Sequence, residues 1–140
     1  MDKQRILTLL DLLDGYLRDL EERLPHTFSE YNKDIEKQRF CERTLQLQIE
    51  VCIDVAYLLV KELKLGLPEK EESVFEKLEE KRIISEELFE KLREMKMFRN
   101  VLIHPYKQIN NSLVYKNAVE KRQDFMDFKK EIISFLKKRR

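Results

Sequence analysis

Residues 49–60, Ile-Glu-Val-Cys-Ile-Asp-Val-Ala-Tyr-Leu-Leu-Val, form the longest nearly apolar stretch of this 140-residue chain. Within it, only Glu50 and Asp54 carry a charge. Because a helix that spans a bilayer needs about 20 apolar residues, the stretch is too short to cross a membrane. A helix that is apolar on nearly every face belongs at the centre of a helical bundle or in an oligomer interface. The stretch therefore predicts a helix that is central to its bundle or that also lies in an oligomer interface.

Apolar residues recur at intervals of three and four on both sides of this stretch, which is the period of an amphipathic helix. Charged residues make up 39% of the chain, with only 2 Gly and 3 Pro, and this composition favours long solvated helices over a sheet. We predict an all-α fold and a single domain over residues 1–140, built as an antiparallel bundle of four long helices and one short one. Ser73 and Ser85 are the predicted caps of the short helix and of the helix after it. The predicted helices cover residues 2–24, from a cap within 29–32 to Leu65, 73–82, 85–104, and from a cap within 110–112 to the basic end at 137–140.

The distribution of charge is uneven along the chain. The net charge of +1 gives the chain as a whole no attraction for nucleic acid or for an anionic membrane. Residues 91–122 differ, because they hold eight basic and two acidic residues, a local charge of +6. Such a region suits a polyanion, although part of it can be ordinary solvated helix surface.

The N-terminus and the two cysteines bear on the compartment. Met1 is followed by a charged, periodic segment rather than by a secretory signal. Cys41 and Cys52 are eleven residues apart, about 16 Å along one helix, which is beyond the reach of a disulfide. Two reduced structural thiols are typical of a cytoplasmic protein, and their spacing matches no metal site. We therefore expect a cytoplasmic protein without membrane contact, bound metal or other cofactor.

Residues 99–106, Arg-Asn-Val-Leu-Ile-His-Pro-Tyr, are the one stretch that core packing does not explain. Pro105 disfavours helical geometry at the residue before it, so the helix should end at His104, where the helix dipole favours a protonated imidazole. Asn100 lies four residues before His104 and shares its face, so the amide can orient the imidazole. Arg99 lies five residues before His104, about 140° around the helix. Within one chain the two groups would not point at one target unless the helix unwinds near Pro105, whereas two copies of the helix that met across a two-fold axis could line one cleft with both pairs.

This stretch resembles the Arg-x4-His-x-Tyr signature of HepT-like toxins, which belong to the HEPN superfamily of small helical ribonucleases. Asn100 also matches a residue typical of that superfamily after the arginine. Residues 39–66 are similar to the family's long second helix, with residues 53–56 in its apolar part, and residues 73–97 are similar to the segment before the motif. The resemblance covers most of the chain from Arg39 on. Together with the spacing of the motif, it implies a HEPN-type bundle that works as a homodimer.

The residue types in the motif suit RNA cleavage without a metal. His104 can remove the 2′-hydroxyl proton, and His104 of a second copy can protonate the leaving 5′-oxygen, because the pKa of histidine lies near neutrality. Arg99 can bind two phosphate oxygens and stabilise the charge of the transition state. Asn100 would hold the imidazole without adding charge. The expected reaction is a metal-independent endoribonuclease cleavage that leaves a 2′,3′-cyclic phosphate.

Two further residues have open roles. Asp54 either pairs with a core cation or caps a neighbouring helix, or it faces the cleft and orients Arg99 or His104. The resemblance implies that Tyr106 is the residue to which a partner nucleotidyltransferase antitoxin adds AMP, which would place phosphate and bulk where RNA must bind. Alternatively, Tyr106 only covers the core beside Pro105.

The resemblance implies the toxin component of a toxin–antitoxin pair, with RNA as substrate and a cognate minimal nucleotidyltransferase as antitoxin. One alternative is a non-catalytic HEPN module that binds a nucleotide or serves as partner subunit of a nucleotidyltransferase. Another is a helical bundle in which the motif is only structural. Arg99→Ala and His104→Ala variants would distinguish these three readings. They would lose RNA cleavage if the protein is a ribonuclease, ligand or partner binding if it is a non-catalytic module, and thermal stability if the motif is only structural.

Overall fold

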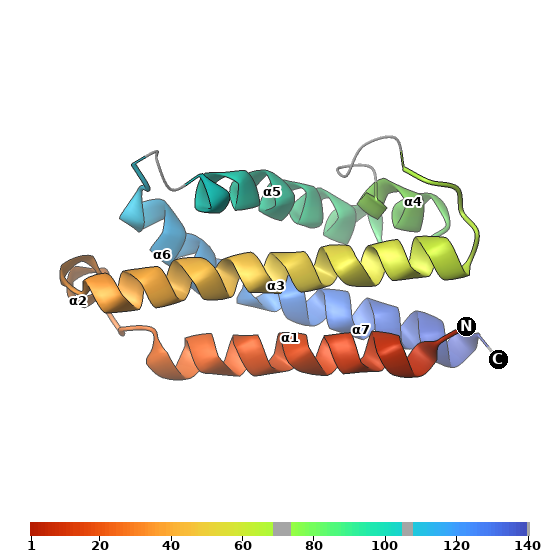
Figure 1. The fold of residues 1–140 in the computed structure, drawn as a ribbon, viewed down its shortest axis with the longest axis horizontal. Coiled ribbons are helices and arrows are strands. Elements are labelled where there is room, and N and C mark those ends of the chain that lie inside the picture. The colour runs from red at the N-terminus through yellow and green to blue at the C-terminus, as the bar shows by residue number, and fades with distance from the viewer. Residues whose placement is uncertain (69–73, 105–107, 140) are drawn as a thin grey trace.

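The computed structural model describes residues 1–68, 74–104 and 108–139 of the chain. Within these ranges the structure contains helices and no strand, which confirms the predicted all-α class. Successive long helices run in opposite directions along the bundle (Figure 1). The long helices are α1 (Lys3–Arg23), α3 (Ile35–Glu62), α5 (Glu86–Ile103) and α7 (Arg122–Lys138). The short helices are α2 (Phe28–Lys33), α4 (Val74–Glu80) and α6 (Asn111–Glu120).

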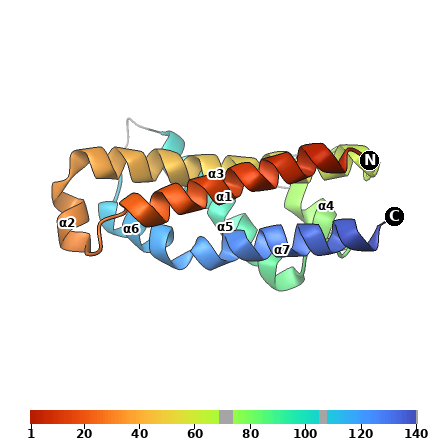
Figure 2. The same ribbon diagram turned by 90° about the horizontal axis from the view of Figure 1, so that it is seen from below.

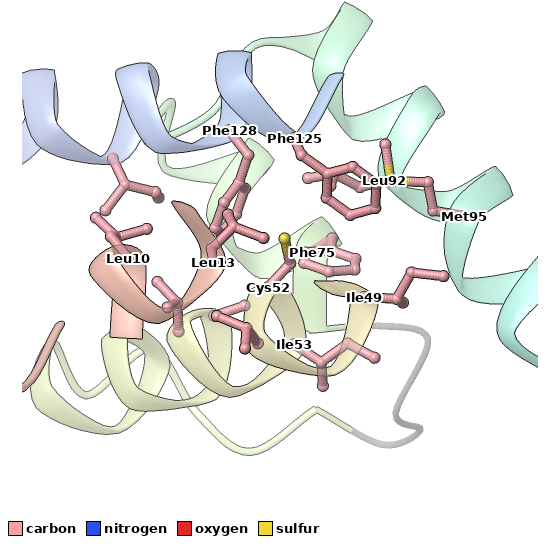
Figure 3. Packing of buried hydrophobic residues seen from close by; sticks show 14 of the residues in the cluster. Leu10, Leu13, Ile49, Cys52, Ile53, Phe75, Leu92, Met95, Phe125 and Phe128 are labelled. Carbon is pink, nitrogen blue, oxygen red and sulfur yellow. The ribbon is translucent and has the colours of Figure 1, made fainter. Parts of the chain in front are cut away.

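The core is organised around α3, which contacts each of the other described helices. The apolar stretch at residues 49–60 forms its C-terminal half, and most of these side chains are buried, as predicted. Figure 3 shows Ile49 and Cys52 of α3 in one cluster with Leu13 of α1 and Phe128 of α7. The ring of Phe128 meets the ring of Phe75 edge-on, with the ring centres 6.4 Å apart. This single cluster ties the four long helices together.

The segment expected to form one helix from 29–32 to Leu65 is divided at Asp34 into α2 and α3. The backbone of Asp34 is extended (φ −116°, ψ 97°), and its carboxylate accepts a hydrogen bond from the N–H of Lys37 at 3.1 Å. Thr27 Oγ1 caps α2 in the same way and accepts from the N–H of Glu30 at 3.2 Å. Each cap pairs an N–H group that the first helical turn cannot satisfy, and contributes about 1 kcal/mol. The prediction of one continuous helix is wrong here, because two capping side chains favour two separate helix starts.

The predicted last helix is also divided, at Lys121, into α6 and α7. α6 reaches α2, where Asn111 Nδ2 donates to Asn32 Oδ1 at 3.1 Å and the Tyr115 hydroxyl donates to the Pro25 carbonyl oxygen at 2.8 Å. α7 instead packs against α1, α3 and α5. The prediction of one helix is wrong because the two halves make contacts in different directions. As a result α2 and α6 lie together at the end of the bundle away from both chain termini (Figure 2).

The cap of α5 and the state of the two cysteines agree with the sequence. Ser85 caps α5 as predicted, with its Oγ accepting from the N–H of Leu88 at 3.1 Å, whereas Ser73 lies outside the described residues. Cys41 and Cys52 are free and buried, which confirms that they do not form a disulfide. Burial raises the pKa of the Cys41 thiol to about 12 and also raises the pKa of Cys52, so neither readily forms the reactive thiolate. None of the described helices is both long enough and apolar enough to cross a membrane.

Candidate functional site

α5 carries the motif, and its boundaries follow from the sequence at both ends. Glu86 and Glu87 lie in the first turn after the Ser85 cap, where acidic side chains suit the positive end of the helix. Ile103 is the last helical residue, and His104 is the C-cap with a non-helical backbone (φ −107°, ψ 78°). The prediction that the helix ends at His104 is therefore confirmed. Pro105 and Tyr106 lie outside the described residues, so the AMP-acceptor role of Tyr106 stays a prediction.

Arg99 and Asn100 occupy different sides of α5. Arg99 continues the buried stripe of Met95 and Leu102, because it lies four residues after one and three before the other. Its side chain is half-buried and its Nε atom is fully buried, whereas Asn100 is exposed. His104 is half-buried and lies where the chain leaves the helix. The arginine thus points to the core side of the helix end, and the amide points to its outer side.

Asp54 is exposed rather than buried, so the expected need for a core cation does not arise. It lines a recess between the start of α1 and the second half of α3, together with Arg5, Leu9, Tyr57, Leu58 and Lys61. α3 and α5 run antiparallel, and both contribute side chains to the buried cluster (Figure 3). The orienting role of Asp54 stays a prediction.

Ion pairs neutralise much of the basic segment at 91–122, so the local charge of +6 overstates the positive field. Lys91 lies 3.4 Å from carboxylate oxygens of both Glu87 and Asp124, and the carboxylate of Asp124 raises the pKa of Lys91. Arg122 lies 2.9 Å from Glu21 of α1. Further pairs are Arg93 with Glu90 at 2.9 Å and Lys121 with Glu94 at 3.3 Å. Several of these acids lie outside residues 91–122. The net charge of that segment alone is therefore higher than the net charge at the surface where it lies.

The described residues do not bring together three His, Cys, Asp or Glu side chains in an arrangement that could hold a metal ion. A buried acid nevertheless lies near the start of α3. Glu42 pairs with Arg39 at 3.0 Å, and burial raises the pKa of its carboxyl, while the charge of Arg39 opposes that shift. The absence of metal dependence remains a prediction about the reaction.

An aromatic cluster at the α2–α6 end was not predicted from the sequence. The Tyr31 ring lies 5.1 Å from the Tyr115 ring, and the Phe28 ring lies 5.8 Å from Tyr115 and 6.3 Å from Tyr31. Together with the Asn111–Asn32 hydrogen bond, the cluster fixes the start of α6, the first described helix after the motif. Helical periodicity marks Tyr31 and Tyr115 only as apolar positions, and it contains no information about contacts across more than 80 residues of sequence.

The motif and the all-helical fold can be compared with known proteins. The family model described as "Ribonuclease HepT-like" matches residues 13–132. The mRNA nuclease HepT of Shewanella oneidensis is 28% identical over 100 residues, which are 71% of this chain and 75% of the relative. The tRNA nuclease HepT of Aphanizomenon flos-aquae is 28% identical over 131 residues, which are 94% of this chain and 89% of the relative.

The fold is shared with a solved tri-AMPylated HEPN toxin of Shewanella oneidensis, which is in complex with MNT antitoxin. The TM-score is 0.85 at 23% identity, and the match covers 92% of this chain and 96% of that chain. This likeness confirms the HEPN-type fold, and the family match confirms the resemblance seen in the motif. The chain belongs to the ribonuclease HepT-like family.

Proposed function

We propose that this protein is an endoribonuclease and the toxin of a toxin–antitoxin pair, and that it cleaves RNA in the cytoplasm as a homodimer. The observation that carries the proposal is the Arg99–His104 pair at the end of α5 in a chain of this family. The nuclease names of its relatives support the activity. The family alternative, a non-catalytic module that binds a nucleotide or a nucleotidyltransferase, would keep the same fold without cleavage.

The chemistry needs only groups that the motif supplies. His104 of one copy takes the proton of a ribose 2′-hydroxyl, and the oxygen attacks the adjacent phosphorus. Arg99 holds the phosphate oxygens as negative charge develops on them. His104 of the other copy gives a proton to the departing 5′-oxygen. The products are a 2′,3′-cyclic phosphate and a 5′-hydroxyl, and no metal takes part in any step.

The outer face of α5 is suited to meet a second copy. Met97 is 63% exposed, and Val101, four residues later, is 38% exposed, so the two form an apolar strip next to the motif. Asn100 lies beside this strip and is also exposed. Burying the strip against its two-fold mate would bring both helix ends together. It would thus place Arg99 and His104 of the two copies around one cleft.

Regulation by the antitoxin is proposed by analogy with the solved HEPN toxin, which carries AMP groups in complex with MNT antitoxin. In this chain the acceptor would be Tyr106, two residues after His104. An AMP group there adds a negative phosphate beside the site that must bind the RNA phosphate, so it would repel the substrate. The cognate antitoxin would be a minimal nucleotidyltransferase.

Mixing subunits tests the composite site. Arg99→Ala and His104→Ala homodimers are each expected to be inactive. A heterodimer of one wild-type and one His104→Ala protomer keeps both Arg99 side chains but only one of the two histidines, and is expected to cleave far more slowly than the wild type because the mechanism uses His104 of both copies. Co-expression with two different affinity tags isolates the heterodimer. If it keeps about half of the wild-type rate, each protomer holds a complete site, and the site does not combine residues across the interface.

A further inference from the structure

Exposed lysines of α2 and α6 lie towards the end of the bundle where α5 ends. Ion pairs occupy Lys91, Arg93, Lys121 and Arg122 along the sides of α5, α6 and α7. By contrast, Lys33 of α2 and Lys116 of α6 are exposed and make no ion pair within the described part of the chain. Figure 1 shows α2, the start of α6 and the end of α5 at the same end of the bundle. An RNA strand that leaves the motif therefore meets unpaired positive charge in the direction of α2.

An aromatic side chain is presented at that end. Phe28 is 37% exposed, whereas Tyr115 is half-buried and Tyr31 is fully buried. The three rings thus form a series from the core to the surface, with Phe28 outermost. Hydrogen bonds fix the start of α2 and the ring of Tyr115, against which Phe28 packs. Thr27 caps α2, and the Tyr115 hydroxyl donates to the Pro25 carbonyl oxygen. Phe28 is therefore a partly exposed ring that contacts the rings of Tyr31 and Tyr115.

We propose that Phe28 is a stacking platform for an unpaired base of the RNA substrate, outside the cleavage site. Single-stranded RNA is commonly held by stacking of its bases on aromatic side chains, with lysine or arginine contacts to the backbone. Phe28 supplies the ring, and Lys33 and Lys116 supply the backbone contacts. Stacking accepts any base, so this platform adds affinity and sets the direction of the strand without demanding a sequence. The proposal rests on the proposed ribonuclease function.

A fluorescence experiment tests the platform directly. The chain contains no tryptophan, so Phe28→Trp introduces a single fluorophore at the platform and keeps an aromatic ring there. The probe is a single-stranded oligonucleotide of about eight nucleotides with 2′-O-methyl riboses, which lacks the attacking hydroxyl and cannot be cleaved. Its addition is expected to quench the introduced tryptophan. The matched control, Met126→Trp on α7, replaces a side chain that is 42% exposed and should show no quenching.

Affinity provides the second measurement. Phe28→Leu keeps an apolar side chain against Tyr115 but removes the stacking ring. Because stacking contributes about 1–3 kcal/mol per base, the variant should bind the labelled oligonucleotide roughly 5–150-fold more weakly than the wild type. Phe28→Tyr should bind about as well as the wild type. Melting temperatures of all variants, measured beside the affinities, show whether each has kept its fold.

The outcomes separate this inference from the proposed function. If the oligonucleotide binds the Phe28→Trp protein without quenching, and Phe28→Leu binds it as tightly as the wild type, the platform is wrong while RNA binding stands. Quenching by a nucleotidyltransferase partner but not by RNA would also overturn the platform, because Phe28 would then belong to a protein interface. If wild-type protein cleaves no RNA in any condition, the proposed function itself fails.

Discussion

Replacing His104 with alanine is expected to lower the rate of RNA cleavage by about 10²–10⁴-fold, because one positioned acid–base group contributes about this much to catalysis. The fold should persist, since His104 is the half-buried C-cap of α5 and not part of the core cluster. We expect a loss of about 1 kcal/mol in the free energy of unfolding, the typical effect of a single substitution. The measurement is the cleavage rate of labelled RNA beside the melting temperature.

The chain offers a matched control, because it has only one other histidine. His26 is exposed in the loop between α1 and α2, where it lines a recess with Leu24 and Tyr115. His26→Ala, purified in the same way, should cleave RNA at the wild-type rate. It also detects contaminating ribonuclease, which would be shared by every preparation. The role given to His104 would be contradicted if the His104→Ala protein cleaved RNA at the wild-type rate. It would also be contradicted if His104→Ala and His26→Ala lost the same share of the cleavage rate.

Replacing Phe128 with alanine is expected to cause the largest loss of stability among the substitutions considered. Phe128 is fully buried on α7 and meets the ring of Phe75 of α4 edge-on at 6.4 Å, in the cluster that also holds Leu13 and Cys52. Removing a buried phenylalanine costs about 3–5 kcal/mol, because the apolar burial is lost and a cavity remains. In a chain of this length we expect the melting temperature to fall by roughly 10–20 °C.

Met126→Ala is the control on the same helix. Its side chain is 42% exposed, so the free energy of unfolding should change by about 0.5 kcal/mol or less. Protein concentration must be equal in all samples, since the melting temperature of the proposed homodimer would depend on it. A Phe128→Ala protein that melts within about 2 °C of the wild type would show that α7 is not anchored through this ring.

The parts of the fold that the sequence predicts are those determined by local pattern. Most of residues 49–60 are buried as expected, because a helix that is apolar on nearly every side is stable only when other elements surround it. α5 ends at His104 because Pro105 restricts the residue before it, and this effect needs no tertiary contact. The motif itself was recognisable because its spacing is short and its residue types are unusual for a helix end.

The rest depends on contacts between residues distant in sequence. The break at Lys121 arises because α6 bonds to Pro25 and Asn32 while α7 packs along α1, and neither direction can be read from residues 110–140. The ion pair between Arg122 and Glu21 likewise spans the chain, so a count of local charge misses it. Asp54 appears buried in the sequence because its neighbours are apolar, yet it lies on the exposed side of α3. Whether a charged residue within an apolar segment is buried or exposed depends on how the helix is rotated within its bundle.

One assay shows whether Arg99 and His104 cleave RNA without a metal. Purified wild-type protein is incubated with single-stranded RNA in excess EDTA, and the 3′ ends of the fragments are analysed. We expect undiminished cleavage that leaves 2′,3′-cyclic phosphates, because the attacking oxygen is the ribose 2′-hydroxyl. Cleavage that stops in EDTA and returns with Mg²⁺, or fragments that end in a 3′-hydroxyl, would contradict it.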